Sequence, residues 1–209
     1  MYQFNATIPI ILASTSPRRR ELLDQVAVPH TCAAVSIDET RLVEESAIDY
    51  IGRMVSQKAQ AALQVLPTAM TECVVITADT IGVLPDGSVL QKPSDFADAC
   101  AMWRQMSNAS HQVWTAVQVS RMAQRDGQWQ MAYTERTVVR TDVKFIALTD
   151  SMMTHYWHTG EPQDKAGGYA IQGLGAAWVK AIDGSYSNVV GLPLVETLDL
   201  LSQAMQTHQ

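Results

Sequence analysis

The sequence contains few cysteines, and they give no sign of a cross-linked or zinc-bound fold. Cys32, Cys73 and Cys100 are odd in number and far apart, which excludes a disulfide framework and a cysteine-rich zinc site. Each stands among apolar neighbours, so we expect three buried free thiols.

Long apolar runs are also missing. No segment approaches the roughly 20 apolar residues that a membrane-spanning helix needs. The apolar run at residues 8–13 is short and lacks the basic residues that precede a secretory signal. These absences predict a protein that has no membrane partner and acts in the cytoplasm.

Basic charge is scarce as well, because 15 Lys and Arg residues face 21 Asp and Glu residues and leave a net charge of −6. A general nucleic-acid-binding surface carries a positive field, so we expect no nucleic-acid partner. Arg18, Arg19 and Arg20 nevertheless stand together. This cluster in an acidic chain is the first indication of a binding function.

The length of 209 residues and an apolar share of 47% fit a single globular domain over residues 1–209. Strand-like and helix-like patterns alternate, and two long strands at 111–123 and 128–148 are joined by a turn at Asp126-Gly127. We therefore expect an α/β fold with a mixed β-sheet flanked by helices. Further strands are expected at 8–13, 30–37, 73–78 and 177–182, a hairpin at 81–90, and helices after the N-caps Ser16, Ser46, Ser94 and Thr149 and from Pro193.

The first strand, the polar loop after it and the next helix form a candidate phosphate site. The first N–H groups of a helix lack partners and carry partial positive charge, which suits an anion. Ser14 and Ser16 add hydroxyl donors, and Arg18 and Arg19 add guanidinium groups that can bind phosphate oxygens. The alternative is a solvated basic face paired with acidic residues of the same helix.

Carboxylates and lysines form the second half of the candidate site. Asp79 follows the clearest buried strand and Glu39 follows another, so both could lie at the carboxyl edge of the sheet. Two carboxylates suit a hard divalent cation, and one could take a proton from water. Lys58 and Lys92 could assist a phosphate leaving group, although a single lysine in such a place is more often a surface residue. Asp79 could equally be a cap on the next turn.

Several short segments share their residues and their order with one known family, over about residues 10–201. Together they resemble the Maf proteins, which are nucleotide pyrophosphatases. The matching segments are 12–23, 38–40, 58–59, 78–80, 92–93, 111–117, 161–162, 164–167, 169–173 and 184–193.

The resemblance implies an elongated α/β fold like that of inosine triphosphate pyrophosphatases, with two lobes around a central cleft, and a homodimer. It implies hydrolysis of a nucleoside triphosphate to the monophosphate and pyrophosphate with Mg²⁺ or Mn²⁺. Asp79 corresponds to the proton acceptor of the family. The residues that correspond to the phosphate and metal region are Ser14, Arg18, Arg19, Glu39, Lys58 and Lys92.

Three positions that vary with base specificity resemble the branch of the family that acts on dTTP and UTP: Arg18, Thr80 and Gln172. The amide of Gln172 offers a donor and an acceptor, which suits the O4/N3 edge of uracil or thymine. Two alternatives stay open. One is an enzyme for 7-methyl-GTP or a damaged purine nucleotide, and the other is a nucleotide-binding cell-division regulator with little catalysis.

One further pair of residues invites a metal-site interpretation. His155 and His158 are three residues apart in a predicted helix, so both can lie on one face. No third His or Cys has a fitting spacing, and we therefore interpret both as exposed helix residues.

Overall fold

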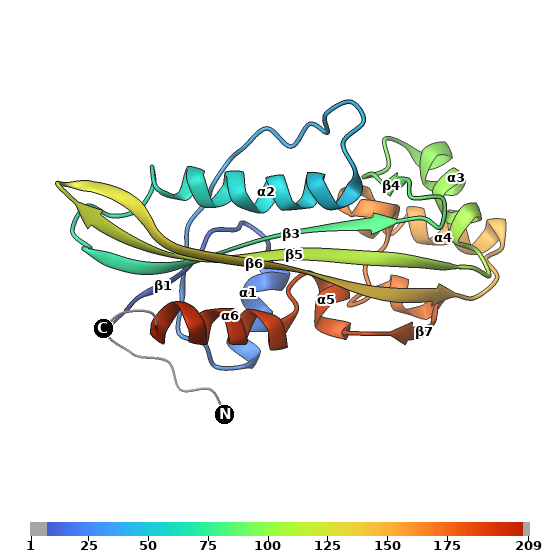
Figure 1. Ribbon diagram of the computed structural model, residues 1–209. Coiled ribbons are helices and arrows are strands. Elements are labelled where there is room, and N and C mark those ends of the chain that lie inside the picture. Colours follow the sequence, from blue (N-terminus) through green and yellow to red (C-terminus); the bar gives the residue numbers. More distant parts are fainter. Residues whose placement is uncertain (1–7, 207–209) are drawn as a thin grey trace. The chain divides into compact units, whose positions relative to one another are not determined.

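The computed structural model describes residues 8–206 (Figure 1). Its strands pair in one sheet in the order β2-β1-β3-β5-β6-β7, with β4 also paired to β3. Strand β1 is parallel to both neighbours, whereas β3 with β4 and β6 with β7 are antiparallel. The predicted α/β fold with a mixed sheet is confirmed.

The strands are β1 (Ile10–Leu12), β2 (Thr31–Cys32), β3 (Glu72–Val83), β4 (Val89–Leu90), β5 (Ser110–Arg125), β6 (Gln128–Phe145) and β7 (Val179–Asp183). The α-helices are α1 (Pro17–Gln25), α2 (Ala47–Ala62), α3 (Phe96–Met106), α4 (Asp150–Trp157), α5 (Tyr186–Val190) and α6 (Leu194–Gln206). Three short 3₁₀ helices are η1 (Glu161–Asp164), η2 (Ala166–Gly168) and η3 (Leu174–Trp178).

Most predicted elements are present, and the differences have local causes. The strand expected at 30–37 is only β2, whose two residues are both exposed. The N-cap of α3 is Asp95, whose carboxylate accepts from the Asp98 amide, and the prediction of Ser94 was wrong. Ser94 instead donates to the Asp98 carboxylate, since an ionised oxygen is the stronger acceptor. The short helix α5 was not predicted.

Contacts divide the described residues into two compact units. The first unit holds the residues up to Asp79, then Ala116–Val138, then the residues from Gly191 onward. The second unit holds Thr80–Thr115 and Val139–Val190. The cleft expected between two lobes stays a prediction.

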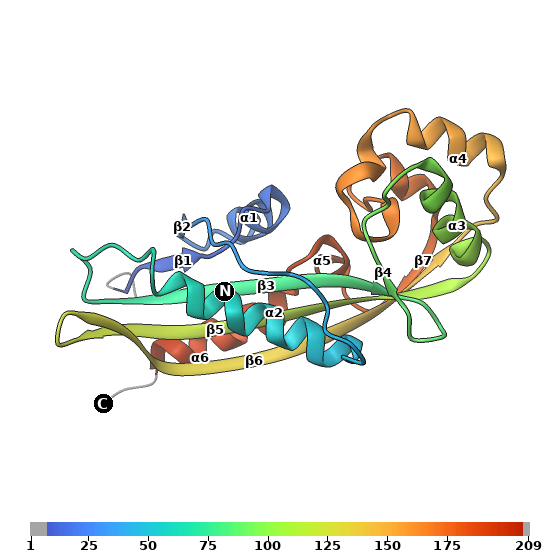
Figure 2. The same ribbon diagram turned by 90° about the horizontal axis from the view of Figure 1, so that it is seen from above.

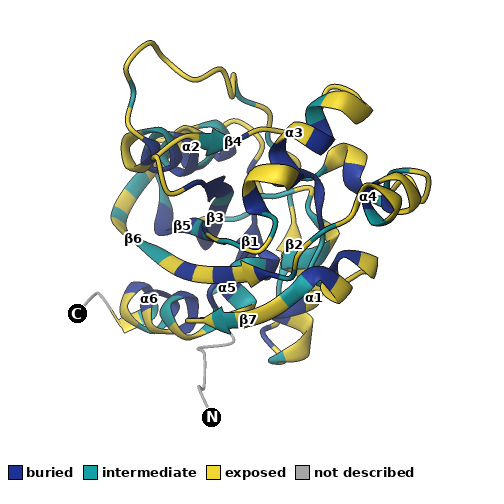
Figure 3. Cartoon of the chain, turned by 90° about the vertical axis from the view of Figure 1, so that its right-hand side faces the viewer, coloured by how far each residue is buried: buried dark blue, intermediate teal, exposed yellow. Residues whose placement is uncertain are grey.

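In the first unit, α2 lies on one face of the sheet and α6 on the other (Figure 1). Ser46 is the N-cap of α2, as predicted, and its hydroxyl accepts from the Asp49 amide at 3.2 Å. The buried face of α2 packs on β1 and β3 in a common apolar cluster that includes Ile11, Ala59 and Val75. Figure 3 shows β3 and β5 mostly buried, as expected for central strands.

In the second unit, the core is largely aromatic. Trp103 packs edge-on against Trp178, with ring centroids 5.0 Å apart, and its indole N–H donates to the carbonyls of Gly167 and Gly168. Helix α3 lies beside α4 and η2, so the segment after Lys165 is held against this core (Figure 2). The predicted hairpin is confirmed, because β3 and β4 pair around a turn in which Gly87 has a φ of +84°.

The prediction of three buried thiols holds for two of them. Cys73 and Cys100 are buried, whereas Cys32 is exposed because it lies on the two-residue edge strand β2. Burial raises the pKa of the Cys73 thiol to about 12. Across residues 8–206, no helix has both the length and the apolar character needed to cross a membrane.

Candidate functional site

The loop after β1 brings Ser14 to the predicted phosphate site. Strands β1 and β3 are parallel with Leu12 beside Ile76, and the Ala13 amide donates to the Ile76 carbonyl at 2.9 Å. The chain therefore leaves β1 beside the part of β3 that leads to Asp79. Parallel strands place their carboxyl ends at one edge, which is where α/β proteins bind ligands.

Helix α1 begins as predicted, with Ser16 as its N-cap and Pro17 in its first turn. The Ser16 hydroxyl caps no amide of α1, and the Ser16 amide donates to the Ser14 hydroxyl at 3.2 Å. The two serines thus form a compact polar turn at the helix start. A turn of this kind can present hydroxyl and amide donors to an anion.

The arginines of α1 differ in their surroundings. The Arg19 side chain donates to the Gly191 carbonyl at 2.8 Å and to the Ser14 hydroxyl at 3.3 Å. Arg18 is half-buried and Arg20 is exposed. The alternative of a solvated basic face therefore applies to Arg20, whereas the Arg19 side chain is held at the start of α1 by its hydrogen bonds.

The charge of Arg19 interacts electrostatically with acidic groups from other elements. The pKa of Arg19 is lowered overall, mainly because the guanidinium is buried, and the positive charge of Arg18 lowers it further. The negative charges of Asp79 and Glu39 act in the opposite direction and raise it. Asp79 and Glu39 are thus near enough to Arg19 for their negative charges to act on it. The basic helix start and the acidic residues belong to one cluster in the first unit.

Lys58 joins the two acidic residues directly. Its Nζ lies 2.6 Å from Asp79 Oδ1 and 3.0 Å from Glu39 Oε1. The side chains of Lys58 and Asp79 are 12% and 15% exposed, whereas that of Glu39 is 53% exposed. Two poorly exposed charges thus meet a carboxylate that solvent can reach, in surroundings where charge interactions are stronger than in bulk water.

The fold fixes Lys58 and Asp79 by tying α2 to β3. Thr77, fully buried two residues before Asp79, donates its hydroxyl to the Val55 carbonyl of α2 at 3.0 Å. Val55 and Lys58 are three residues apart and so lie on neighbouring turns of one helix face. The contact fixes the position of α2 relative to β3, and it therefore keeps Lys58 within reach of Asp79.

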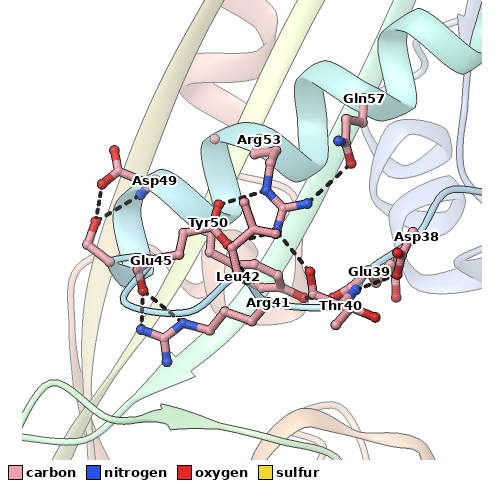
Figure 4. Close-up of polar contacts among 12 residues, drawn as sticks. Asp38, Glu39, Thr40, Arg41, Leu42, Glu45, Asp49, Tyr50, Arg53 and Gln57 are labelled. Carbon is pink, nitrogen blue, oxygen red and sulfur yellow. Dashed lines mark hydrogen bonds and ion pairs between the residues drawn. The ribbon is translucent and has the colours of Figure 1, made fainter.

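The loop that carries Glu39 is clamped to α2 by groups that the sequence analysis did not identify (Figure 4). Arg53 binds the Glu45 carboxylate through Nε and Nη2, both at 2.7 Å, and donates to the Thr40 carbonyl at 3.0 Å. Tyr50 donates its hydroxyl to the Glu39 carbonyl at 3.0 Å. We call these contacts the loop clamp.

Electrostatics agree with this arrangement. Hydrogen bonds from Arg53 lower the pKa of Glu45 to about 2. The pKa of Tyr50 is raised, first by burial and then by the negative charges of Asp79 and Glu39. The loop clamp could not be predicted from the sequence. Glu45 lies before the helix, and its partner Arg53 lies eight residues later, whereas side chains that pair on a helix are three or four residues apart.

The remaining predicted residues belong to the second unit, and their placement beside the first-unit cluster stays a prediction. Thr80 shares a hydrogen bond with Thr115 at 2.9 Å, and Thr115 donates to the Asn188 carbonyl. Lys92 is exposed just after β4. Gln172 is exposed between η2 and η3.

The carboxylates of Glu39 and Asp79 are the groups that could hold a cation. Within residues 8–206, no cluster of three or more His, Cys, Asp or Glu residues has metal-binding geometry. A pair of carboxylate oxygens still fits Mg²⁺, which commonly binds one or two carboxylates and completes its shell with water and substrate phosphates. His155 is exposed on α4 and His158 is exposed as its C-cap, so their interpretation as exposed residues of this helix is confirmed.

Comparisons with known proteins show which family the sequence matches. The pattern of the Maf-like protein family matches residues 9–204. A dTTP/UTP pyrophosphatase of Psychrobacter cryohalolentis is 48% identical over 221 residues, which cover 95% of this chain and 98% of the relative. The dTTP/UTP pyrophosphatases of Pseudoalteromonas atlantica and Vibrio vulnificus are 46% and 44% identical, and the alignments cover 96% and 93% of this chain and 99% and 97% of the relatives.

Proposed function

Because this chain belongs to the Maf-like protein family, we propose that it hydrolyses dTTP and UTP to the monophosphate and pyrophosphate. One observation carries the proposal: Lys58 joins Asp79 and Glu39 in the same cluster as Arg19 at the start of α1. Such a cluster offers cations to a polyphosphate and carboxylates to water and metal. Curated relatives with this activity in their names align over nearly the whole chain.

The residues divide the work by charge. Ser14, Ser16, Arg18 and Arg19 bind phosphate oxygens at the start of α1, where the helix dipole also favours an anion. Asp79 takes a proton from the attacking water. The water oxygen bonds to the α-phosphorus, the bond from that phosphorus to the α–β bridging oxygen breaks, and pyrophosphate leaves with the bond's electron pair. Lys58 and Lys92 stabilise the charge on the leaving group.

A divalent cation, Mg²⁺ or Mn²⁺, is part of the proposal. Glu39 and Asp79 would hold it together with phosphate oxygens of the substrate. When bound, it would neutralise phosphate charge and so make the anhydride easier to attack. The exposure of Glu39 is consistent with a ligand that the solvent and the substrate can both reach.

Base selection is assigned to Arg18, Thr80 and Gln172. The exposed amide of Gln172 can donate to O4 and accept from N3 of uracil or thymine. We also propose that the protein is a homodimer, as the resemblance to the family implies. We further propose that it acts in the cytoplasm, where nucleoside triphosphates are plentiful. Light scattering on the purified protein tests the dimer.

The decisive experiment is pyrophosphate release from a nucleotide panel with Mg²⁺ or Mn²⁺. We expect turnover of dTTP and UTP, with lower rates for CTP, inosine triphosphate and 7-methyl-GTP. Asp79→Asn should lower kcat by about 100-fold or more, because it removes the proton acceptor. Asp126→Asn is the matched control, since Asp126 is exposed in the β5–β6 turn and asparagine tolerates its φ of +53°.

Three results would contradict the proposal. Preference for 7-methyl-GTP or a purine analogue would reassign the substrate. Nucleotide binding without turnover would favour a regulator. Release of inorganic phosphate in place of pyrophosphate would place the broken bond elsewhere.

A further inference from the structure

Residues 170–175, which carry Gln172, wrap around the carboxylate of Glu161. The amide of Leu174 donates to Glu161 Oε2 at 3.0 Å, and the amide of Gly175 donates to Glu161 Oε1 at 3.1 Å. The turn is closed by its own backbone, because the Gly173 amide donates to the Ala170 carbonyl at 3.2 Å. One side chain therefore holds the backbone on the C-terminal side of Gln172.

Tyr156 of α4 holds the other side of the same turn. Its hydroxyl donates to Glu161 Oε1 at 2.6 Å and accepts from the Ala170 amide at 3.1 Å. Tyr156 itself is buried, and its ring packs against Trp103 and Trp178 of the second-unit core. The turn around Gln172 is thus tied to rigid structure through Tyr156 and Glu161.

Glycine is required where the turn approaches these side chains. A Cβ at Gly173 would lie 2.2 Å from Glu161 Oε2. A Cβ at Gly175 would lie 2.6 Å from the Tyr156 hydroxyl oxygen and 2.8 Å from the Ala170 carbonyl oxygen. The backbone comes so close to the Glu161 carboxylate at Gly173, and to Tyr156 and Ala170 at Gly175, because these two residues lack a side chain.

The carboxylate is kept ionised by these contacts. Burial alone would raise the pKa of Glu161, but hydrogen bonds from Tyr156, Leu174 and Gly175 and the charge of Lys165 lower it below the usual range. A carboxylate that accepts several N–H and O–H bonds makes charge-assisted hydrogen bonds, which are the stronger kind. At neutral pH the anchor is therefore fully formed.

We propose that Glu161 is a positioning residue for base selection, which fixes the backbone of residues 170–175 and thereby the direction of the Gln172 side chain. This inference rests on the proposed function of Gln172. It assigns a task to a carboxylate that lies outside the Glu39, Lys58 and Asp79 cluster.

Base discrimination needs such an anchor. Uracil carries a carbonyl acceptor where cytosine carries an amino donor, so a Gln172 side chain that could approach from several directions could present either its NH₂ group or its oxygen to that position. A fixed backbone limits the places and directions from which the amide can reach the base. Discrimination between these bases therefore depends on the groups that hold Gln172 as well as on Gln172 itself.

The test is a double-mutant cycle on the ratio of kcat/KM for UTP to kcat/KM for CTP. Glu161→Gln keeps the shape of the side chain but turns an NH₂ group toward one of the amides that it binds. We expect it to lower the UTP/CTP ratio about tenfold, the worth of roughly one hydrogen bond. Adding Gln172→Ala should then lower the ratio no further than Gln172→Ala does alone.

Two other variants complete the design. Tyr156→Phe keeps the ring in the core and removes only the hydroxyl, so it replaces Glu161→Gln in the test if that variant fails to fold. It should also lower the UTP/CTP ratio, and adding Gln172→Ala should then lower the ratio no further than Gln172→Ala does alone. Glu135→Gln, an exposed residue of β6, is the control for loss of a charge and should leave the ratio unchanged.

The outcomes separate this inference from the proposed function. A wild-type protein that hydrolyses no nucleotide would overturn the proposed function. An active wild type whose UTP preference survives Glu161→Gln and Tyr156→Phe would overturn the role of Glu161 alone. The role of Glu161 would also be overturned if its substitution and Gln172→Ala lowered the UTP/CTP ratio additively. The same holds if Glu161→Gln lowered kcat/KM equally for UTP and CTP, because a merely structural residue behaves in that way. A wild type without UTP preference overturns it too.

Discussion

Lys58 places one ammonium group between two carboxylates in the cluster that we propose as the polyphosphate site. Without that cation, Asp79 and Glu39 would repel an incoming anion and each other. Its low exposure makes the interaction with each partner stronger than at an open surface. At the scale of single residues, the balance of charge in the site therefore depends on Lys58.

We expect Lys58→Met to reduce kcat/KM for UTP by about 100-fold, the usual cost of removing one group that stabilises developing charge. Lys58→Arg keeps the charge but changes its shape, so it should recover only part of the activity. Steady-state kinetics of both variants check this expectation. Lys144→Met, at an exposed position of β6, should match the wild type. Full activity of Lys58→Met would remove Lys58 from the mechanism.

At the scale of elements, the loop clamp connects residues 38–46 to α2. Arg53 contributes a bidentate ion pair with Glu45 and a bond to the Thr40 backbone, and the Glu45 side chain is only 8% exposed. A loop without strands or helices can present Glu39 at a fixed place only if such contacts offset its conformational entropy. The clamp therefore holds the loop in the position that the proposed role of Glu39 requires.

The clamp predicts a pH dependence of stability. The pKa of Glu45 is about 2 in the folded protein against an ordinary 4.5. Its contribution is therefore complete above about pH 4.5 and is lost as the pH falls toward 2. Glu45→Gln should lower the free energy of unfolding at pH 7, and the difference from wild type should shrink below pH 4.5. Denaturant unfolding at several pH values measures it, and a difference that stays constant with pH would contradict the ion pair.

The clamp also predicts where the backbone loosens when it is broken. Arg53→Met should increase hydrogen exchange in residues 38–46 while the strand β3 stays protected, since local opening needs few contacts to be lost. Exchange measured by mass spectrometry gives the answer by segment. Equal loss of protection in β3 would mean that Arg53 supports the global fold instead.

At the scale of the whole molecule, a buried histidine makes stability sensitive to acid. His111 is 1% exposed, its Nε2 lies 2.8 Å from the Tyr169 hydroxyl, and its ring packs against Phe145. Burial lowers the pKa of His111 to about 4, although the charge of Asp142 opposes this. The folded protein therefore keeps this imidazole neutral at a pH where the unfolded chain has already protonated it.

We expect the free energy of unfolding to fall as the pH drops from about 6.5 to about 4. The contribution of His111 is complete above this window and is lost within it, because only the unfolded state binds the proton there. His111→Phe should flatten the slope in this window, even if it changes stability at pH 7. Thermal unfolding of both proteins across the window tests the difference, and equal slopes would contradict it.

We also propose that residues 1–209 unfold as one domain. Strands β3, β5 and β6 each contribute residues to both compact units, so neither unit can lose its strands without affecting the other. Calorimetry should give one transition whose calorimetric and van't Hoff enthalpies agree. Two separate transitions would show that the units unfold independently.

The sequence alone determined the local structure and the chemical types of the site. Apolar runs predicted β1 and β3, the pattern of Ser46 and Asp49 predicted the start of α2, and Asp126-Gly127 predicted the turn between β5 and β6. These features are encoded by neighbouring residues, whose side-chain size and hydrogen bonds act within a few positions. For the same reason Ser14, Arg19, Glu39, Lys58 and Asp79 could be named as candidates.

Only the tertiary structure decided which of these groups meet. Asp79 and Glu39 share Lys58 because the Thr77 contact holds α2 against β3 and the loop clamp holds the 38–46 loop against α2. Sequence also failed at Cys32, which is exposed because β2 lies at the sheet edge, and it gave no sign of the Glu161 anchor. Such contacts join residues far apart in the chain, and their energies depend on distance and burial, which local patterns do not specify.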